Sequence, residues 1–268
     1  MGPLRRFVKR VPGAVAAVAA LRRGQARLGR AVRHGRHWWR RAPDGLPIPP
    51  PELLYRVSGA ADVEWFLRGG AWARQAIEQI LAAAGASLPA GARVLDFGCG
   101  CGRVARAWLT AGDWRFTGTD ADSAAVRWCR RHLPKAHFLS NGPWPPLALP
   151  AASCDLVYAL SVFTHLPEAQ QRAWFAELGR VLAPEGWLVV SVHGEAYLPE
   201  LGPVEQAAFR SGELVVVGGD EAGSNACNAF HPTAAVPALA IGWEIVARWP
   251  EGARGNPKQD LLLLRKAR

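Results

Sequence analysis

A glycine-rich turn between two acidic residues constrains this 268-residue chain more than any other feature. The stretch 93–120 reads RVLDFGCGCGRVARAWLTAGDWRFTGTD. A short apolar run ends at Asp96, a glycine turn and a helical run follow, and a second apolar run ends at Asp120. The glycines of the turn are Gly98, Gly100 and Gly102. Strand, glycine turn, helix, strand and acidic residue in this order predict the first half of a nucleotide-binding α/β fold.

The spacing of the glycines and the position of the acids indicate the class of ligand. A dinucleotide fingerprint is G-x-G-x-x-G, but here the third glycine comes one residue early and Arg103 stands at the expected place. Asp96, at the mouth of the loop, would repel a pyrophosphate but suits a ligand that carries an ammonium and a sulfonium. Asp120, 18 residues after Gly102, is placed to accept hydrogen bonds from ribose hydroxyls. This pattern favours S-adenosylmethionine over NAD.

Three segments carry a family resemblance. VLDFGCGCGRVAR, then FTGTDAD and then CDLVYALSVFTHL closely resemble the class I S-adenosylmethionine-dependent methyltransferases, in the order and spacing of that family. The resemblance covers roughly residues 60–192. It implies a doubly wound, mostly parallel seven-stranded sheet that ends in an antiparallel hairpin. It also implies S-adenosylmethionine as the cofactor and a methyl acceptor as the substrate.

The resemblance further implies which residues contact the cofactor. Asp96 is expected near the methionine end, Asp120 at the ribose and Asn141 near the adenine. The alternative for Asn141 is a turn residue, because Gly142-Pro143 follows it. The complete predicted cofactor set is Asp96, Phe97, Gly98, Cys99, Gly100, Gly102, Asp120, Ala121, Asn141 and Ser161. A cysteine within the loop is expected to pack and not to act as a nucleophile.

The candidate catalytic residues are three histidines. Methyl transfer mainly requires alignment of acceptor and methyl group and exclusion of water. A hydroxyl acceptor must also lose a proton, and histidine is the side chain best suited to accept it near neutral pH. His165 and His193 follow the fourth and fifth predicted strands, and His231 lies in a predicted substrate-side insertion over residues 194–241. For each, the alternative is a hydrogen-bonded structural histidine. No metal site is predicted, because the cysteines lack ligand spacing.

The composition divides the chain into a basic arm and a nearly neutral body. Residues 1–42 hold twelve Arg or Lys and no acid, whereas the remaining residues hold twenty basic and twenty-two acidic side chains. Residues 14–40 are predicted to form a basic helix. Its apolar run is too short to cross a bilayer. The arm is expected to associate weakly with an anionic membrane or RNA, or to be a solvated extension.

Proline and glycine positions predict the remaining boundaries. The proline-rich segment 43–51 is predicted to be a linker, with an arm and linker over 1–51 and a methyltransferase domain over 52–268. Residues 60–84 read as helical, and Gly69-Gly70 is expected to break them into two helices. Pro184-Glu185-Gly186 is predicted to turn into the fifth strand, and Phe230-His231-Pro232 to start a helix.

The function expected from these features is methylation of an oxygen or nitrogen of a small molecule, such as a sugar or natural product. Two alternatives stay open: an RNA or protein methyltransferase that uses the basic arm, and a binding protein that keeps the cofactor but not catalysis. The five cysteines fit reduced thiols in a cytoplasmic protein, which could lie peripherally at a membrane surface.

Overall fold

The computed structural model describes residues 42–59, 61–256 and 258–267, and the chain divides into two compact units, residues 1–63 and 64–268. The predicted basic helix 14–40 lies outside the described residues, so the arm and its association with a membrane or RNA stay predictions. In the first unit, residues 42–50 lead into α3 (Pro51–Ser58). Pro51 was predicted to lie in the non-helical linker, but it occupies the first turn of α3, where a missing backbone N–H is tolerated.

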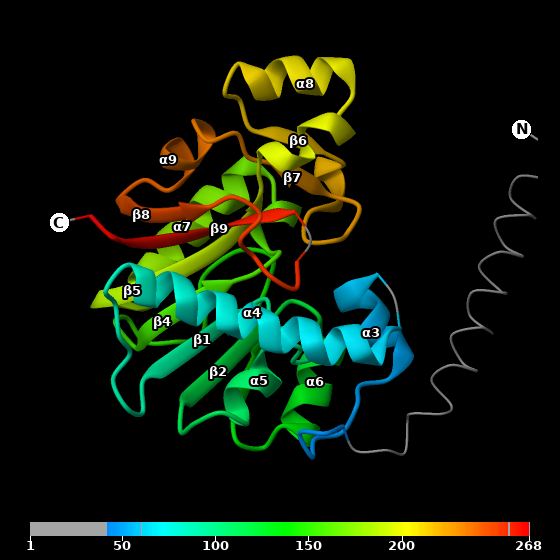
Figure 1. The fold of residues 1–268 in the computed structure, drawn as a ribbon, viewed down its shortest axis with the longest axis vertical. Helices are drawn as coiled ribbons and strands as arrows, with labels where there is room; N and C mark the ends of the chain where they lie inside the picture. The colour runs from blue at the N-terminus through cyan, green and yellow to red at the C-terminus, as the bar shows by residue number, and fades with distance from the viewer. Residues whose placement is uncertain (1–41, 60, 257, 268) are drawn as a thin grey trace, which may run out of the picture. The chain divides into compact units, whose positions relative to one another are not determined.

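The second unit is built on a single sheet, in which the described residues form nine strands (Figure 1). The parallel part has the order β3-β2-β1-β4-β5. Its strands are β1 (Arg93–Phe97), β2 (Arg115–Asp120), β3 (His137–Ser140), β4 (Cys154–Ala159) and β5 (Leu182–His193). β9 (Gln259–Lys266) pairs antiparallel with β5, and β8 (Trp243–Trp249) pairs antiparallel with β9. The predicted doubly wound fold with a closing hairpin is confirmed, although the described residues form two strands more than the predicted seven.

Helices cover both faces of this sheet. α4 (Val63–Ala83) crosses in front of the strands in Figure 1, and α7 (Glu168–Val181) lies behind them. The other helices of this α/β pattern are α5 (Ala105–Leu109), α6 (Ser123–His132) and α9 (Ala235–Leu239). The strands between the helical layers are apolar and fully buried, as at Leu95, Val157 and Val190. Burial on both faces explains why these strands read as continuous apolar runs.

α4 is one continuous helix, so the predicted break at Gly69-Gly70 is wrong. The two glycines serve packing instead. A Cβ atom on Gly70 would lie 2.0 Å from the carbonyl oxygen of Arg103, and a Cβ atom on Gly255 would lie 2.2 Å from the carbonyl oxygen of Gly69. The absence of side chains lets α4 approach the end of the glycine loop and the β8–β9 connection closely.

The fifth strand and the insertion also differ from prediction. β5 begins at Leu182, and the expected turn at 184–186 is an irregularity within it, between the pairs Cys154–Leu182 and Leu156–Trp187. Phe230 does not start a helix, because it ends β7 (Asn228–Phe230), which pairs with β5 at His193. The insertion also contains the 3₁₀ helix η2 (Glu195–Glu200), α8 (Pro203–Arg210) and β6 (Val215–Val217). Leu201, Phe209 and Val215 form a small core of its own.

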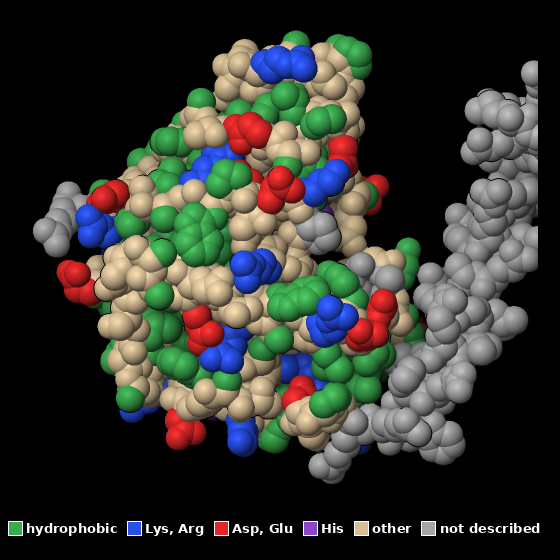
Figure 2. All heavy atoms as spheres, in the orientation of Figure 1, with side chains coloured by type: hydrophobic (Ala, Val, Ile, Leu, Met, Phe, Trp, Pro, Cys, Tyr) green, Lys and Arg blue, Asp and Glu red, His purple; other side chains and the backbone are tan. Residues whose placement is uncertain are grey.

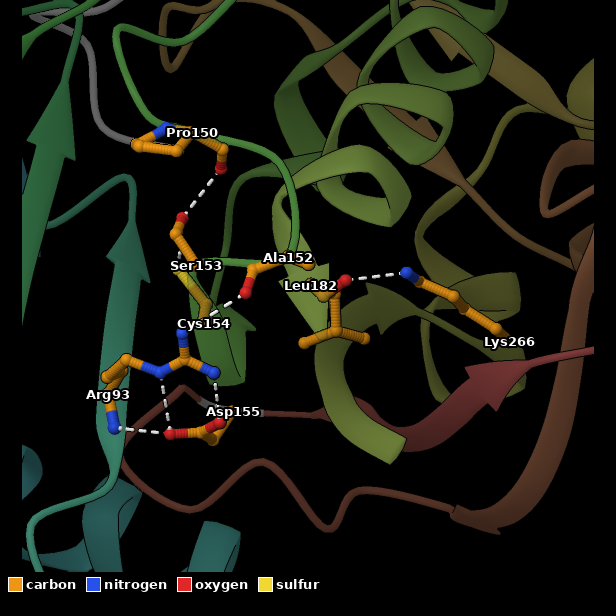
Figure 3. Close-up of polar contacts among 8 residues, drawn as sticks. All are labelled: Arg93, Pro150, Ala152, Ser153, Cys154, Asp155, Leu182 and Lys266. Carbon is orange, nitrogen blue, oxygen red and sulfur yellow. Dashed lines mark hydrogen bonds and ion pairs between the residues drawn. The ribbon is translucent and has the colours of Figure 1, made fainter. Parts of the chain in front are cut away.

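An ion pair joins the amino ends of two central strands (Figure 3). Arg93 donates from its backbone N, Nε and Nη2 to the two carboxylate oxygens of Asp155, over 2.8, 3.0 and 2.6 Å. Arg93 Nη1 also reaches the carbonyl oxygen of Ala152 over 3.1 Å. Asp155, near the amino end of β4, therefore has a structural role at the edge of the sheet opposite the glycine loop.

Charged side chains of both signs are mixed on the surface of the protein. The face in Figure 2 carries Lys or Arg and Asp or Glu side chains interspersed over the sheet and its helices. That mixture matches the nearly balanced charge of the body. None of the described helices is both long enough and apolar enough to cross a membrane.

Candidate cofactor and acceptor site

The glycine loop follows β1 and is held against the end of β2. The backbone N–H groups of Gly98 and Cys99 donate to the carbonyl oxygen of Thr119 over 2.8 and 3.0 Å. Gly98 has φ of 84°, in the left-handed region that favours glycine. A Cβ atom there would lie 2.2 Å from Val162 Cγ2. Only glycine allows this close approach to the segment that follows β4.

Asp120, the last residue of β2, is bonded to the loop. Its Oδ2 accepts from the Gly100 N–H over 2.6 Å, and its Oδ1 accepts from the Asp122 N–H over 2.7 Å. Burial raises the pKa of the Asp120 carboxyl, and the two backbone hydrogen bonds oppose that shift. Each carboxylate oxygen has two lone pairs, so each can accept one further hydrogen bond. Asp120 can therefore support the loop and still accept hydroxyls of a ligand.

Asp96 is a buried carboxylate with an unused oxygen. It is 3% exposed, and its Oδ2 has no hydrogen-bond partner among the described residues. Burial raises the pKa of Asp96 to about 7. The hydroxyl of Tyr158, which lies opposite Asp96 on β4, opposes this rise. An unpaired buried carboxyl is costly unless a donor or cation reaches it. This oxygen fits the ammonium of S-adenosylmethionine.

The cysteines of the loop lie beneath it. The thiols of Cys99 and Cys129 both approach the carbonyl oxygen of Gly100, at 3.6 and 3.5 Å. Burial raises the pKa of the Cys101 thiol, and the Cys99 pKa is also raised, first by its hydrogen bond with Cys129. A buried thiol with a raised pKa is a poor nucleophile. These contacts fit the predicted packing role.

Arg103, which sequence reasoning used only to exclude a dinucleotide, connects three elements. Its guanidinium donates to the Gly255 carbonyl oxygen over 3.2 Å and to Asn256 Oδ1 over 2.7 Å. It also lies 5.2 Å from the centre of the Trp65 ring of α4. Arg103 thus anchors the β8–β9 connection and α4 to the cofactor loop. The early arrival of the third glycine was the only sequence signal for this residue.

The remaining predicted cofactor residues differ in what they offer. The ring of Phe97 packs on Trp174 at 4.6 Å, so its side chain belongs to the core and only its backbone is left for a ligand. Ala121 is exposed directly after β2. Asn141 lies beside Asp120, whose carbonyl oxygen accepts its N–H over 3.1 Å. Asn141 Oδ1 has no partner among the described residues and is a suitable acceptor for the amino group of adenine.

Ser161 is held in an uncommon conformation after β4. Its backbone φ is 58°, a value that residues other than glycine rarely adopt. Its N–H donates to Ser191 Oγ, Ser191 Oγ donates to Gln259 Oε1, and Gln259 Nε2 donates to Ser161 Oγ, over 2.7, 2.7 and 3.0 Å. This closed ring of hydrogen bonds joins the carboxyl ends of β4 and β5 to β9. Gln259 was not predicted to belong to the site.

The three candidate histidines have different environments. His165 Nδ1 donates to the carbonyl oxygen of Cys227 over 2.8 Å, because a carbonyl can only accept. The neutral ring therefore keeps its lone pair on Nε2. Burial lowers the pKa of His165, so the ring is uncharged at neutral pH. This histidine can accept a proton at Nε2.

His193 and His231 are more deeply buried. Burial, together with the nearby His165, lowers the pKa of His193 to about 4. His231 Nε2 lies 3.0 Å from Gln171 Oε1, while Gln171 Nε2 donates to the carbonyl oxygens of Phe163 and Leu166. His231 must therefore donate from Nε2, and burial lowers its pKa to about 3. These contacts favour a structural role for His231.

All these groups gather at one edge of the sheet. These groups are the loop after β1, Asp120 at the end of β2, Asn141 after β3, Ser161 after β4 and His193 at the end of β5. They lie at the carboxyl ends of parallel strands, where ligands bind in open α/β sheets. Within the described residues, no group of three or more His, Cys, Asp or Glu side chains could hold a metal ion.

A family model described as "Methyltransferase domain" matches residues 94–186, which span the glycine loop, Asp120 and the segment after β4. The chain carries a class I S-adenosylmethionine-dependent methyltransferase domain. The match ends within β5, so it leaves the predicted insertion over residues 194–241 uncovered.

Solved structures share the fold of this methyltransferase domain. The CcbJ methyltransferase from Streptomyces caelestis is 14% identical, with a TM-score of 0.53, and the match covers 82% of this chain and 91% of that one. A methyltransferase from Methanosarcina mazei is 18% identical, with a TM-score of 0.51, over 67% and 94% of the two chains. The glycopeptide N-methyltransferase MtfA, solved with S-adenosylmethionine, is 16% identical, with a TM-score of 0.51, over 73% and 94%.

Proposed function

We propose that this protein transfers the methyl group of S-adenosylmethionine to an oxygen or nitrogen of a small molecule. The single observation that carries the proposal is the buried Asp96 carboxylate in β1, whose Oδ2 has no hydrogen-bond partner among the described residues and which lies directly before the glycine loop. S-adenosylmethionine, when bound, supplies an activated methyl group. We propose the catalytic domain over 52–268 and the acceptor-side insertion over 194–241.

Each predicted cofactor residue has a role in this proposal. Asp96 binds the ammonium, Asp120 accepts the ribose hydroxyls and Asn141 Oδ1 accepts from the adenine amino group. The loop residues Phe97, Gly98, Cys99, Gly100 and Gly102 contribute backbone atoms, as do Ala121 and Ser161. MtfA and CcbJ, as methyltransferases of the same fold, support the reaction class but not a particular acceptor.

His165 is the proposed general base. Its Nδ1–H is bound to the Cys227 carbonyl oxygen, which orients the ring and leaves Nε2 to accept the proton of an acceptor hydroxyl. S-adenosylmethionine held by the loop would then supply the methyl group to the deprotonated oxygen, with S-adenosylhomocysteine as the leaving group. His193 stands at right angles to His165, with ring centres 6.3 Å apart, and is proposed to line the acceptor side.

Calorimetric titration of the full chain tests the cofactor assignment. We expect binding of S-adenosylmethionine but not of NAD, and at least tenfold weaker binding for Asp96→Asn, because a charged hydrogen bond is lost. Asp113→Asn is the matched control, since Asp113 is exposed before the amino end of β2. Binding of NAD in preference to S-adenosylmethionine, or an unchanged affinity in Asp96→Asn, would contradict the proposal.

We also propose that the protein acts in the cytoplasm, because all five cysteines are free thiols and a reducing compartment keeps them so. Fractionation of cells that express the full chain tests this location.

A further inference from the structure

Three aromatic rings form a wall beside His165, and the proposed function gives a role to only one of them, His193. The wall consists of His193, Tyr197 and Phe230. The centre of the His193 ring lies 4.1 Å from that of Tyr197 and 5.3 Å from that of Phe230, and the last two rings lie 5.9 Å apart. Distances in this range are those of rings in contact.

The wall combines residues of the central sheet and of the segment 194–241. His193 is the last residue of β5, Tyr197 belongs to η2, and Phe230 ends β7. His193 is buried, whereas Tyr197, Phe230 and the neighbouring His165 are each partly exposed. The wall therefore has accessible ring surface at the edge of the sheet where the cofactor residues lie.

The carboxylate that acts on two rings of this surface is paired with a lysine. The pKa of His193 is lowered to about 4, so its ring is neutral at physiological pH. Glu200, the carboxylate that acts on both His193 and Tyr197, pairs with Lys258 over 2.5 Å. A charged acceptor would lose its hydration here without gaining a counter-charge.

We propose that the wall of His193, Tyr197 and Phe230 is the acceptor subsite and that the acceptor is an uncharged aromatic compound with a hydroxyl group. The acceptor ring stacks on Tyr197 and Phe230, and its hydroxyl points to Nε2 of His165. This inference rests on the proposed function and adds the class of substrate and two specificity-determining residues, Tyr197 and Phe230.

The composition of the wall favours an aryl hydroxyl over a sugar. A sugar buries several hydroxyls, and each one without a partner costs free energy. The three rings of the wall and His165 offer few hydrogen-bonding groups, and His165 Nε2 is reserved for the reacting hydroxyl. An aryl compound buries a flat apolar face and needs one polar contact only.

Binding of 2-naphthol and of methyl α-glucoside to the full chain, saturated with S-adenosylhomocysteine, tests this inference by calorimetry. We expect 2-naphthol to bind and the glucoside not to bind. Tyr197→Leu and Phe230→Leu should each weaken 2-naphthol at least tenfold, because they remove a stacking ring and keep an apolar side chain. Tyr197→Phe should bind within about twofold of the unchanged protein, because it keeps the ring.

Controls separate this inference from the cofactor assignment. S-adenosylhomocysteine affinity and thermal unfolding are measured for every variant, and Val204→Ala, on the exposed side of α8, controls for changes in the insertion. Unchanged S-adenosylhomocysteine binding with lost 2-naphthol binding supports the aromatic subsite. Preference for the glucoside overturns it while the cofactor assignment stands. The same holds if both leucine variants bind 2-naphthol as tightly as the unchanged protein does. Failure to bind S-adenosylhomocysteine overturns both proposals.

Discussion

The backbone N–H of Gly100 donates to Oδ2 of Asp120 over 2.6 Å, so the acidic residue that ends β2 supports the glycine loop after β1. The same carboxylate accepts the Asp122 N–H through Oδ1. Asp120 therefore has two roles, one in the shape of the loop and one toward a ligand. The two adjacent strands meet at this residue because they are parallel and in register, with Thr119 opposite Phe97.

Asp120→Ala should weaken S-adenosylmethionine binding by about 1.5–3 kcal/mol, or about 10- to 150-fold, because charge-assisted hydrogen bonds are lost. Calorimetric titration measures this change. The exposed Asp113→Ala is the control and should bind normally. An affinity within twofold of the unchanged protein would show that Asp120 supports the loop alone.

Cofactor binding should depend on pH through Asp96, whose pKa is raised to about 7 by burial. An ammonium binds the ionised carboxylate, so affinity should rise about five- to tenfold from pH 6 to pH 7.5, with release of a proton. Titrations in buffers of different ionisation enthalpy measure that proton. The amino group of the ligand itself titrates near pH 8, so Asp96→Asn, which should lack this rise, is the reference. A parallel rise in both proteins would exclude Asp96 as its source.

The same Asp96 carboxyl should make the unliganded protein less stable as the pH rises, whereas cofactor affinity rises with pH. Because folding raises its pKa, its contribution to the free energy of unfolding is fully present below about pH 4, the value in an unfolded chain. That contribution is lost as the pH rises through about 7. Denaturant unfolding of the unchanged protein and of Asp96→Asn is measured between pH 5 and pH 8. The free energy of unfolding of the unchanged protein should fall relative to that of Asp96→Asn as the pH rises.

Asp155→Asn should lower the free energy of unfolding by about 1–2 kcal/mol and leave cofactor affinity unchanged, because it breaks the partly exposed pair with Arg93 at the opposite edge of the sheet. Hydrogen bonds from Arg93 lower the pKa of Asp155. The stabilisation is therefore present above about pH 4 and is lost as the pH falls through the lower folded value. Glu64→Gln removes the more exposed pair with Arg68 and should cost at most about 0.5 kcal/mol.

Gly70→Ala should destabilise the protein, although alanine favours a helix by about 1 kcal/mol. The new Cβ would lie 2.0 Å from the Arg103 carbonyl oxygen, and such overpacking costs roughly 1–3 kcal/mol. Gly142→Ala is the control, because its nearest atom would be 3.6 Å away. Thermal unfolding compares the two variants. A more stable Gly70→Ala protein would mean that α4 does not need this close approach.

His165→Gln should reduce kcat for a hydroxyl acceptor by about 100-fold or more, because a positioned general base contributes about 10²–10⁴-fold. S-adenosylmethionine affinity should not change. The exposed His137→Gln serves as the control. Equal kcat in the two variants would assign proton removal to solvent or to another group.

Local sequence patterns predicted the frame of this site. The glycine spacing, the acids after two apolar runs and the alternation of strands with helices placed Asp96, Asp120 and Asn141 at one edge of a parallel sheet. They succeeded because the carboxyl ends of parallel strands must meet at one edge. The match to a methyltransferase family model over residues 94–186 is confined to this same part of the chain.

Contacts between distant segments could not be predicted in this way. Gly69-Gly70 looked like a helix break, but its meaning depends on Arg103 and Gly255 beside it. The ring of hydrogen bonds around Ser161 depends on Gln259, 98 residues away, and no local pattern signals that pairing.

The sequence by itself therefore determined the fold class, the cofactor loop and its acids, because these follow from local periodicity and from turn chemistry within short stretches. Only the tertiary structure decided which ring nitrogen of His165 and of His231 is bound, since that depends on whether Cys227 or Gln171 lies beside the ring. It also decided that Tyr197 and Phe230 meet His193, because three separate segments converge there. Side chains that acquire their properties from neighbours far along the chain cannot be assigned before those neighbours are placed.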